Sequence, residues 1–216
     1  MPKSRGKANK PVKPVLHIFC EGEKTEPIYL NGYLERFHPG NRRLNVIKVE
    51  KTKKNTPVQL VNEAIKKKKD SLFSDCFWVI YDRESPLKYP DSLHKNAYDK
   101  ASAKRINIAI TNVCFEVWLL LHFIEVSAPY ISCDDLLKNS PLKTKLKENG
   151  ITQYEKSDTT IFPILETHIQ EARQRAEKMN RITSEASYDS ETYKLNPYTD
   201  VYMLLDAIDA FVKKTK

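Results

Sequence analysis

Carboxylates follow two apolar segments of the chain, and they are the residues best suited to chemistry. Glu21 comes directly after the apolar run 15–20, and Asp82 and Glu84 follow a second apolar run, 76–81. Carboxylate oxygens without a histidine or cysteine cluster are the ligands that Mg²⁺ and Mn²⁺ prefer in proteins. These ions complete their coordination with water and substrate phosphates. The residue types therefore point to phosphoryl chemistry.

These carboxylates converge only if both apolar runs are strands of one parallel sheet. Each run is short, apolar and rich in strand-forming residues, and helical patterns lie between the predicted strands. Parallel strands place their carboxyl ends at the same edge of a sheet, so we expect Glu21, Asp82 and Glu84 to meet there. An acidic residue after a strand can also be an ordinary loop residue, and we accept that reading for Glu23 and Asp91.

The remaining elements follow from hydrophobic periodicity and from helix start and stop signals. Strands are predicted over 15–20, 44–49, 76–81 and 106–110, and helices after Thr25, after Thr56, over 90–103 and from Phe115, with later helices over 133–146, 158–181 and 198–213. With 216 residues, of which 40% are hydrophobic, the chain can bury one sizeable core. The predicted organisation is a disordered basic arm over 1–13, an α/β core over 14–125 with a parallel four-stranded sheet flanked by helices, and a helical C-terminal elaboration over 126–216 packed on that core.

A third candidate group lies on a helix that is apolar all round from Phe115 onward. Glu116 and His122 are its only polar side chains. Burying a carboxylate without a partner is costly, so each is either satisfied within the core or part of the site. We favour the core role for His122, and both readings stay open for Glu116. Glu116 is kept as a candidate catalytic residue. Glu26 and His122 are candidates for contacting the catalytic residues without binding the metal or substrate themselves.

The net charge bears on the class of partner. The chain has 36 Lys and Arg against 28 Asp and Glu, which gives +8 and favours a polyanion such as nucleic acid. A solvated, lysine-rich surface accounts for the same composition. Lys24 follows the first strand and could neutralise charge on a scissile phosphate. The candidate nucleic-acid contacts are Lys24, Arg83, Arg173 and Lys178, although solvation of the helix face also accounts for Arg173 and Lys178.

Several classes of protein are disfavoured by what the sequence lacks. The four cysteines show no CxxC spacing, so we predict neither a zinc site nor disulfides. No long apolar segment and no signal-peptide core occur, which predicts a cytoplasmic protein without membrane contact. There is no P-loop motif and there are only five glycines, so ATP hydrolysis would need a partner.

Four stretches resemble, in order, the signatures of the RloB family, also called AbiL component two. They are CEGEKTEPIY at 20–29, YDRE at 81–84, the segment 112–123, and NPYT at 196–199. The resemblance implies a Toprim-like fold, whose first strand ends in a glutamate and whose third ends in an Asp-x-Asp pair that holds Mg²⁺. Glu21 matches that glutamate and Asp82 the first aspartate. The family is associated with phage defence by abortive infection, usually alongside a separate ATPase.

The chain departs from the family pattern at two positions. Glu84 replaces the second aspartate, which keeps an oxygen ligand but changes its reach, and Val113 stands where proline is frequent. The resulting prediction is a Mg²⁺- or Mn²⁺-dependent nuclease of bacterial anti-phage abortive infection, with RNA such as tRNA favoured over DNA by analogy. The alternative is a non-catalytic nucleic-acid-binding or regulatory subunit of an ATPase-containing defence complex.

Overall fold

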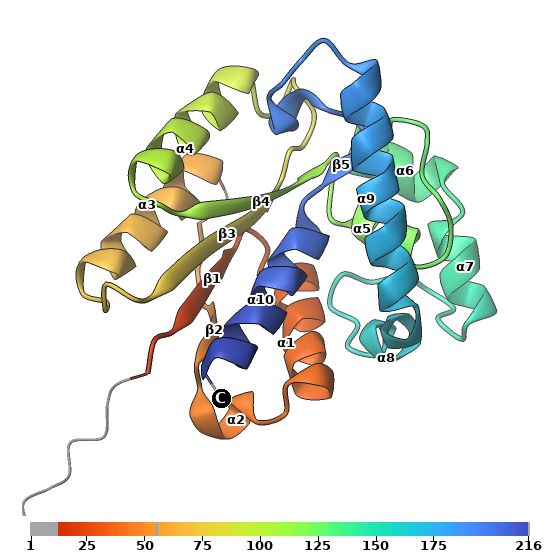
Figure 1. Ribbon diagram of the computed structural model, residues 1–216. Helices are drawn as coiled ribbons and strands as arrows, with labels where there is room; N and C mark the ends of the chain where they lie inside the picture. Colours follow the sequence, from red (N-terminus) through yellow and green to blue (C-terminus); the bar gives the residue numbers. More distant parts are fainter. Residues whose placement is uncertain (1–12, 55, 216) are drawn as a thin grey trace, which may run out of the picture.

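A five-stranded sheet forms the centre of the protein in the computed structural model, which describes residues 13–54 and 56–215 (Figure 1). The strand order is β2-β1-β3-β4-β5. The strands are β1 (Leu16–Cys20), β2 (Ile47–Glu50), β3 (Cys76–Asp82), β4 (Asn107–Asn112) and β5 (Tyr198–Thr199). Neighbours among β1 to β4 pair in parallel, whereas β5 pairs antiparallel with β4. The predicted α/β class with a mostly parallel sheet is therefore confirmed, and the predicted strand number is one too low.

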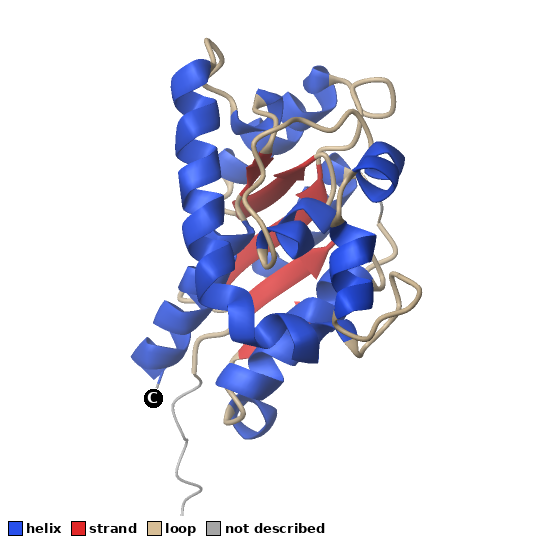
Figure 2. Cartoon of the chain, turned by 90° about the vertical axis from the view of Figure 1, so that its right-hand side faces the viewer, coloured by secondary structure: helices blue, strands red, loops and turns tan. Residues whose placement is uncertain are grey.

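Helices surround this sheet, and Figure 2 shows the strands in the middle of the molecule. The helices are α1 (Thr25–Phe37), α2 (Asn41–Leu44), α3 (Pro57–Lys69), α4 (Asp91–Ala103), α5 (Glu116–Leu121), α6 (Cys133–Asn139), α7 (Leu142–Glu148), α8 (Ile161–Leu165), α9 (Ile169–Ala186) and α10 (Val201–Thr215). Within the described residues, none of them is both long and apolar enough to cross a membrane.

Two hydrophobic clusters cover the two faces of the sheet. Alternate strand residues such as Phe19 and Phe77 pack with α3 and α4 in one cluster. Their neighbours, such as Ile18 and Ile80, pack in the other cluster with α1, α5, α9 and α10. All five residues of β1 are buried, as expected for a parallel strand covered on both faces. The carboxyl ends of the strands are thereby fixed by a packed core.

The predicted start of the second strand, at residue 44, is wrong because a short helix precedes β2. Residues 41–44 form α2, and Asn45 takes a left-handed conformation with φ 49°. The Asn41 side chain then donates to Ile47 O and accepts from Ile47 N, both at 2.9 Å. These bonds turn the chain into β2, which starts at Ile47 rather than at Leu44.

Three predicted helices are interrupted. The predicted helix over 133–146 divides into α6 and α7 at Ser140, since a residue before proline disfavours the helical region. The predicted helix over 158–181 consists of α8, a 3₁₀ turn (Glu166–His168) and α9, which continues to Ala186. The predicted helix from Tyr198 instead begins with β5, which pairs Thr199 with Thr111 and is too short to show a strand period.

The predicted basic arm over 1–13 lies outside the described residues, except for its last residue. Lys13 Nζ donates to Thr215 O at 2.6 Å, which ties the start of the described chain to the end of α10. The segment from 126 onward contributes both helices and the edge strand β5, so it is part of the same sheet architecture.

Candidate active site

The neighbouring strands β1 and β3 bring the two principal carboxylates together. Cys20 lies opposite Ile80 in the parallel register, so Glu21 and Asp82 follow at the same edge of the sheet. The Glu21 backbone N–H donates to Ile80 O at 2.9 Å. The Asp82 backbone N–H donates to Glu21 Oε2 at 3.0 Å. The backbone that ends β3 therefore orients the Glu21 carboxylate directly.

A cavity of about 310 Å³ lies at this edge and is lined by six carboxylates, of which Glu23 is exposed. We call it the acidic pocket, and its five less exposed carboxylates are Glu21, Glu26, Asp82, Glu84 and Glu116. Lys24 and Lys156 also line it. The carboxylates come from the end of β1, the first turn of α1, the end of β3 and the first turn of α5, so segments distant in sequence meet here.

Glycine at position 22 allows the Glu26 carboxylate to fold back against the turn. Gly22 N donates to Glu26 Oε1 at 3.3 Å. A Cβ added at Gly22 would lie 2.2 Å from Glu26 Oε2, so no larger residue fits while this carboxylate keeps its place. The turn after β1 thus needs glycine for a close approach, and that approach places Glu26 in the acidic pocket.

Burial and mutual repulsion hold three of these carboxyl groups in an unusual ionisation range. Burial raises the pKa of Glu21 to about 7, and the charges of Glu26 and Glu84 add to this against the hydrogen bonds from Asp82 N and Tyr89. Burial, and then the charges of Glu26 and Glu116, raise the pKa of Asp82 well above its ordinary value. Burial likewise raises the pKa of Glu26. A cation in the pocket would relieve this repulsion.

Glu116 is the exception because a lysine already neutralises it. Its side chain is fully buried, and Oε1 lies 3.2 Å from Lys156 Nζ and accepts a 2.8 Å hydrogen bond from Tyr154 Oη. Burial pushes the pKa of Glu116 upward, but Lys156 and the hydrogen-bonding groups around it outweigh burial and the pKa lies below its ordinary value. Glu116 thus lines the pocket and is also satisfied, so both readings of this residue stay open.

Glu84 reaches the pocket through an uncommon backbone conformation. Its φ is 57°, in the left-handed region that a non-glycine residue seldom adopts. The Glu84 N–H donates to Val113 O at 2.9 Å, and Lys88 Nζ lies 2.6 Å from Glu84 Oε1. Backbone strain of this kind tends to occur at functional positions. Glu84 therefore differs from the expected aspartate in the length of its side chain, and its left-handed backbone also changes the direction in which that side chain leaves the chain.

A second group of side chains adjoins the acidic pocket and could hold a softer metal ion. One ligand atom from each of Cys114, Glu116 and Cys133 lies within 4.8 Å of the others. Lys156 Nζ lies 3.9 Å from Cys133 Sγ and 3.2 Å from Glu116, so its ammonium group currently supplies the positive charge there. Cysteine spacing did not reveal this group, because α5 and α6 bring together thiols that are nineteen residues apart, the difference between positions 114 and 133.

Two of the predicted nucleic-acid contacts are engaged inside the protein. Arg83 is 3% exposed, its Nε and Nη1 donate to Tyr193 O and Tyr89 O at 2.7 Å, and it also pairs with Asp91. This guanidinium ties the end of β3 to its surroundings, and little of it is accessible to a phosphate. Arg173 binds Asp206, Asp209 and Tyr33, which links α9, α10 and α1.

The other predicted residues are distributed as follows. Lys24 is exposed at the rim of the acidic pocket. Lys178 is exposed and pairs with Glu125 at 2.7 Å, away from the pocket lining. His122 is buried among aromatic rings, where its Nε2 and Tyr29 Oη are 3.0 Å apart. Burial lowers the pKa of His122 to about 3, which agrees with the neutral core role we favoured.

Three residues of the site gave no signal in the sequence. Tyr154 and Lys156 lie in an irregular segment between α7 and α8, which carries no hydrophobic period. Tyr89 lies in the turn before α4, and its hydroxyl donates to Glu21 Oε1 at 3.3 Å. Residues in such loops are placed by tertiary packing, so their role appears only in the folded chain.

The fold and this site define an α/β protein with an acidic pocket at the carboxyl ends of its parallel strands. The family model described as RloB-like protein matches residues 16–208, which is most of the chain, so this protein belongs to the RloB-like family. Comparisons with curated proteins and with solved structures give no match. The finer, Toprim-like description stays a prediction.

Proposed function

We propose that this protein is a divalent-cation-dependent phosphodiesterase that cleaves nucleic acid. The observation that carries the proposal is the acidic pocket, where six carboxylates and two lysines line about 310 Å³. Burial first, and then the charges of neighbouring carboxylates, raise the pKa values of Glu21 and Asp82. Raised values of this kind, in a cavity, are typical of functional sites.

The donor set supports Mg²⁺ or Mn²⁺ at Glu21, Asp82 and Glu84. All three offer hard oxygen ligands, and the two principal ones have raised pKa values that a bound cation would reverse. The Cys114 and Cys133 thiols suit a softer ion, and Lys156 already balances Glu116 between them. When bound, the ion would supply charge neutralisation at a scissile phosphate and a more acidic water.

The protein's own residues prepare the pocket for that role. The Asp82 N–H and the Tyr89 hydroxyl bind different oxygens of Glu21 and so fix the plane of its carboxylate. Lys156 and Tyr154 hold Glu116 in its buried position. Lys24, exposed at the rim, is placed to attract a phosphate group. Each of these contacts exists before any ligand binds, which reduces the reorganisation that catalysis requires.

Two further parts of the proposal rest on the family resemblance alone. They are the association with a separate ATPase and the role in abortive infection. The choice of RNA such as tRNA over DNA is likewise an analogy. The experiment below therefore separates cleavage from these assignments.

Purified protein is incubated with tRNA, single-stranded DNA and duplex DNA in Mg²⁺, in Mn²⁺ and in EDTA. We expect cleavage of at least one substrate with metal, none in EDTA, and a loss of about 100-fold or more in Asp82→Asn. The matched control is Glu23→Gln, because Glu23 lines the same pocket but is exposed. Binding without cleavage of any substrate, with the ATPase added, would favour a non-catalytic binding subunit instead.

A further inference from the structure

Three adjoining hollows form one groove that leads to the acidic pocket. A cavity of about 480 Å³ shares Gly22 and Glu23 with the acidic pocket. A third cavity, of about 540 Å³, shares Asn31, Val49 and Lys51, among others, with the second. We call the second and third cavities together the edge groove. It runs between α1 and β2 and opens at one end onto the carboxylates.

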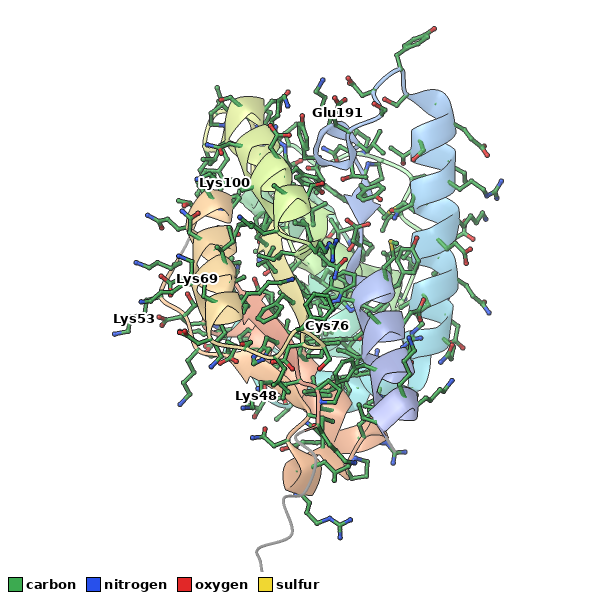
Figure 3. The ribbon with its side chains drawn as sticks, turned by 60° about the vertical axis from the view of Figure 1, so that its left-hand side comes forward. Lys48, Lys53, Lys69, Cys76, Lys100 and Glu191 are labelled. Carbon is green, nitrogen blue, oxygen red and sulfur yellow. The ribbon has the colours of Figure 1, made fainter. Side chains whose placement is uncertain are left out.

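Among the residues that the structure describes, the edge groove has lysines along its rim that lack acidic partners. Lys48, Lys51 and Lys53 line it, and none of them pairs with a carboxylate within the described part of the chain. Some lysines elsewhere are paired, as in Lys95 with Asp99, whereas the groove places three without such a partner along one hollow. Figure 3 shows Lys48 and Lys53 on the same side of the molecule. The charge of this rim is therefore free to act on a ligand.

The carboxylates near these lysines are mostly engaged. Glu50 Oε1 lies 2.6 Å from His17 Nδ1, and Glu35 pairs with Arg42 at 3.1 Å. Glu23 is the exception, and it lies where the edge groove meets the acidic pocket. The groove thus changes from basic along β2 to acidic at its inner end. A polyanion would be attracted along the rim and would enter the acidic pocket only with a cation present.

The groove also offers hydrogen-bonding groups. β2 is an edge strand and pairs only with β1 among the described residues. The Asn41 side chain occupies the N–H and C=O of Ile47, and the rest of the second edge of β2 can meet a ligand with backbone groups. The Asn31 side chain adds an amide, and Val49 contributes an apolar surface. This combination suits a flexible chain of bases, sugars and phosphates.

We infer that the edge groove binds a single strand of nucleic acid and guides it to the carboxylates. The inference rests on the proposed phosphodiesterase function and names the form of its substrate. A groove with positive charge on its rim can track one flexible backbone, as single-strand-binding proteins do. A duplex is stiffer, and bending it toward the half-buried Asp82 would cost additional free energy. An acidic peptide added to β2 is the outcome that the experiment must exclude.

The test measures binding in EDTA, so it does not depend on cleavage. Fluorescence anisotropy follows labelled 20-nucleotide RNA, DNA and duplex DNA over a salt series. The groove variant is Lys48→Ala/Lys51→Ala/Lys53→Ala. The matched control removes the same charge from α6 and α7, which lie far from β2 in Figure 1, through Lys138→Ala/Lys143→Ala/Lys147→Ala; these three lysines are exposed.

Wild-type protein should bind a single strand more tightly than a duplex. Three phosphate contacts correspond to a change of about 2 in the slope of log K against log salt, or about 20-fold in affinity between 50 and 200 mM salt. We expect the groove variant to lose this salt-dependent part and the control variant to keep it. Equal binding by both variants, or tighter duplex binding, would overturn the inference. It would also be overturned if an acidic peptide were the only competitor that displaced nucleic acid from the wild type.

The two proposals can fail separately. If the groove variant loses binding but wild type never cleaves, the groove assignment stands and the phosphodiesterase proposal falls. If wild type cleaves and the groove variant binds and cleaves a single strand equally well, the phosphodiesterase proposal stands and the groove assignment falls. Retained cleavage of a dinucleotide by the groove variant would further support a role in guiding long strands.

Discussion

Replacing Glu21 with glutamine should stabilise the metal-free protein at alkaline pH. The pKa of this carboxyl group is raised from 4.5 to about 7, mainly by burial. A folded-state pKa above the unfolded value means that the unfolded chain releases its proton first as the pH rises. The wild type therefore loses free energy of unfolding between about pH 4.5 and pH 7, whereas Glu21→Gln has no proton to lose at this position.

The size of this effect follows from the pKa change. A difference between 4.5 and about 7 corresponds to about 3 kcal/mol of free energy of unfolding. The amide can still accept one hydrogen bond but replaces one oxygen with a donor, so we expect a net gain of about 1 to 3 kcal/mol at pH 8. Adding Mg²⁺ should then stabilise the wild type and have little effect on the variant.

Urea denaturation in EDTA at pH 5 and pH 8 measures both effects. The matched control is Glu23→Gln, an exposed carboxylate of the same pocket, which should show no such pH-dependent gain. The reasoning is refuted if the difference between Glu21→Gln and wild type is the same at both pH values. It is also refuted if Mg²⁺ stabilises the variant as much as the wild type.

The remaining predictions concern other groups. Gly22→Ala should weaken Mg²⁺ binding about tenfold or more by displacing Glu26, as measured by calorimetry, and unchanged affinity would contradict the close approach. Lys156→Met should lower the free energy of unfolding by about 2 kcal/mol, less than for a fully buried pair because Lys156 is half-exposed, and adding Glu116→Gln should restore it. Burial raises the pKa of Asp200 from 3.8 to about 6. The free energy of unfolding of the wild type, measured by urea denaturation, should therefore fall by about 3 kcal/mol across that pH range through this group, and Asp200→Asn should not show this loss. Equal pH profiles of the two proteins would contradict this.

The strand ends were predictable because both signals are local. An apolar run followed by a carboxylate marks the end of a buried strand, and parallel pairing then brings Glu21 and Asp82 together. Glu116 was also predictable as a buried carboxylate, since its helix is apolar all round. In each case the residue pattern contains its own physical constraint.

The partners of these residues were not predictable in the same way. Lys156 neutralises Glu116 from a loop whose position depends on packing against the whole domain. Arg83 follows the key aspartate and resembles a phosphate contact in sequence, yet the fold buries it against Tyr193 O. Strand β5 has only two residues, so neither alternation nor length could identify it. These features depend on long-range contacts that a local pattern does not contain.

The most direct test of the central claim is the anomalous scattering of Mn²⁺ soaked into crystals of the protein. The account predicts a peak in the acidic pocket, about 2.1 Å from carboxylate oxygens of Glu21 and Asp82. The peak should be absent from Asp82→Asn crystals prepared in the same way. A wild-type crystal with no peak there, or with its peak only between Cys114 and Cys133, would contradict the account.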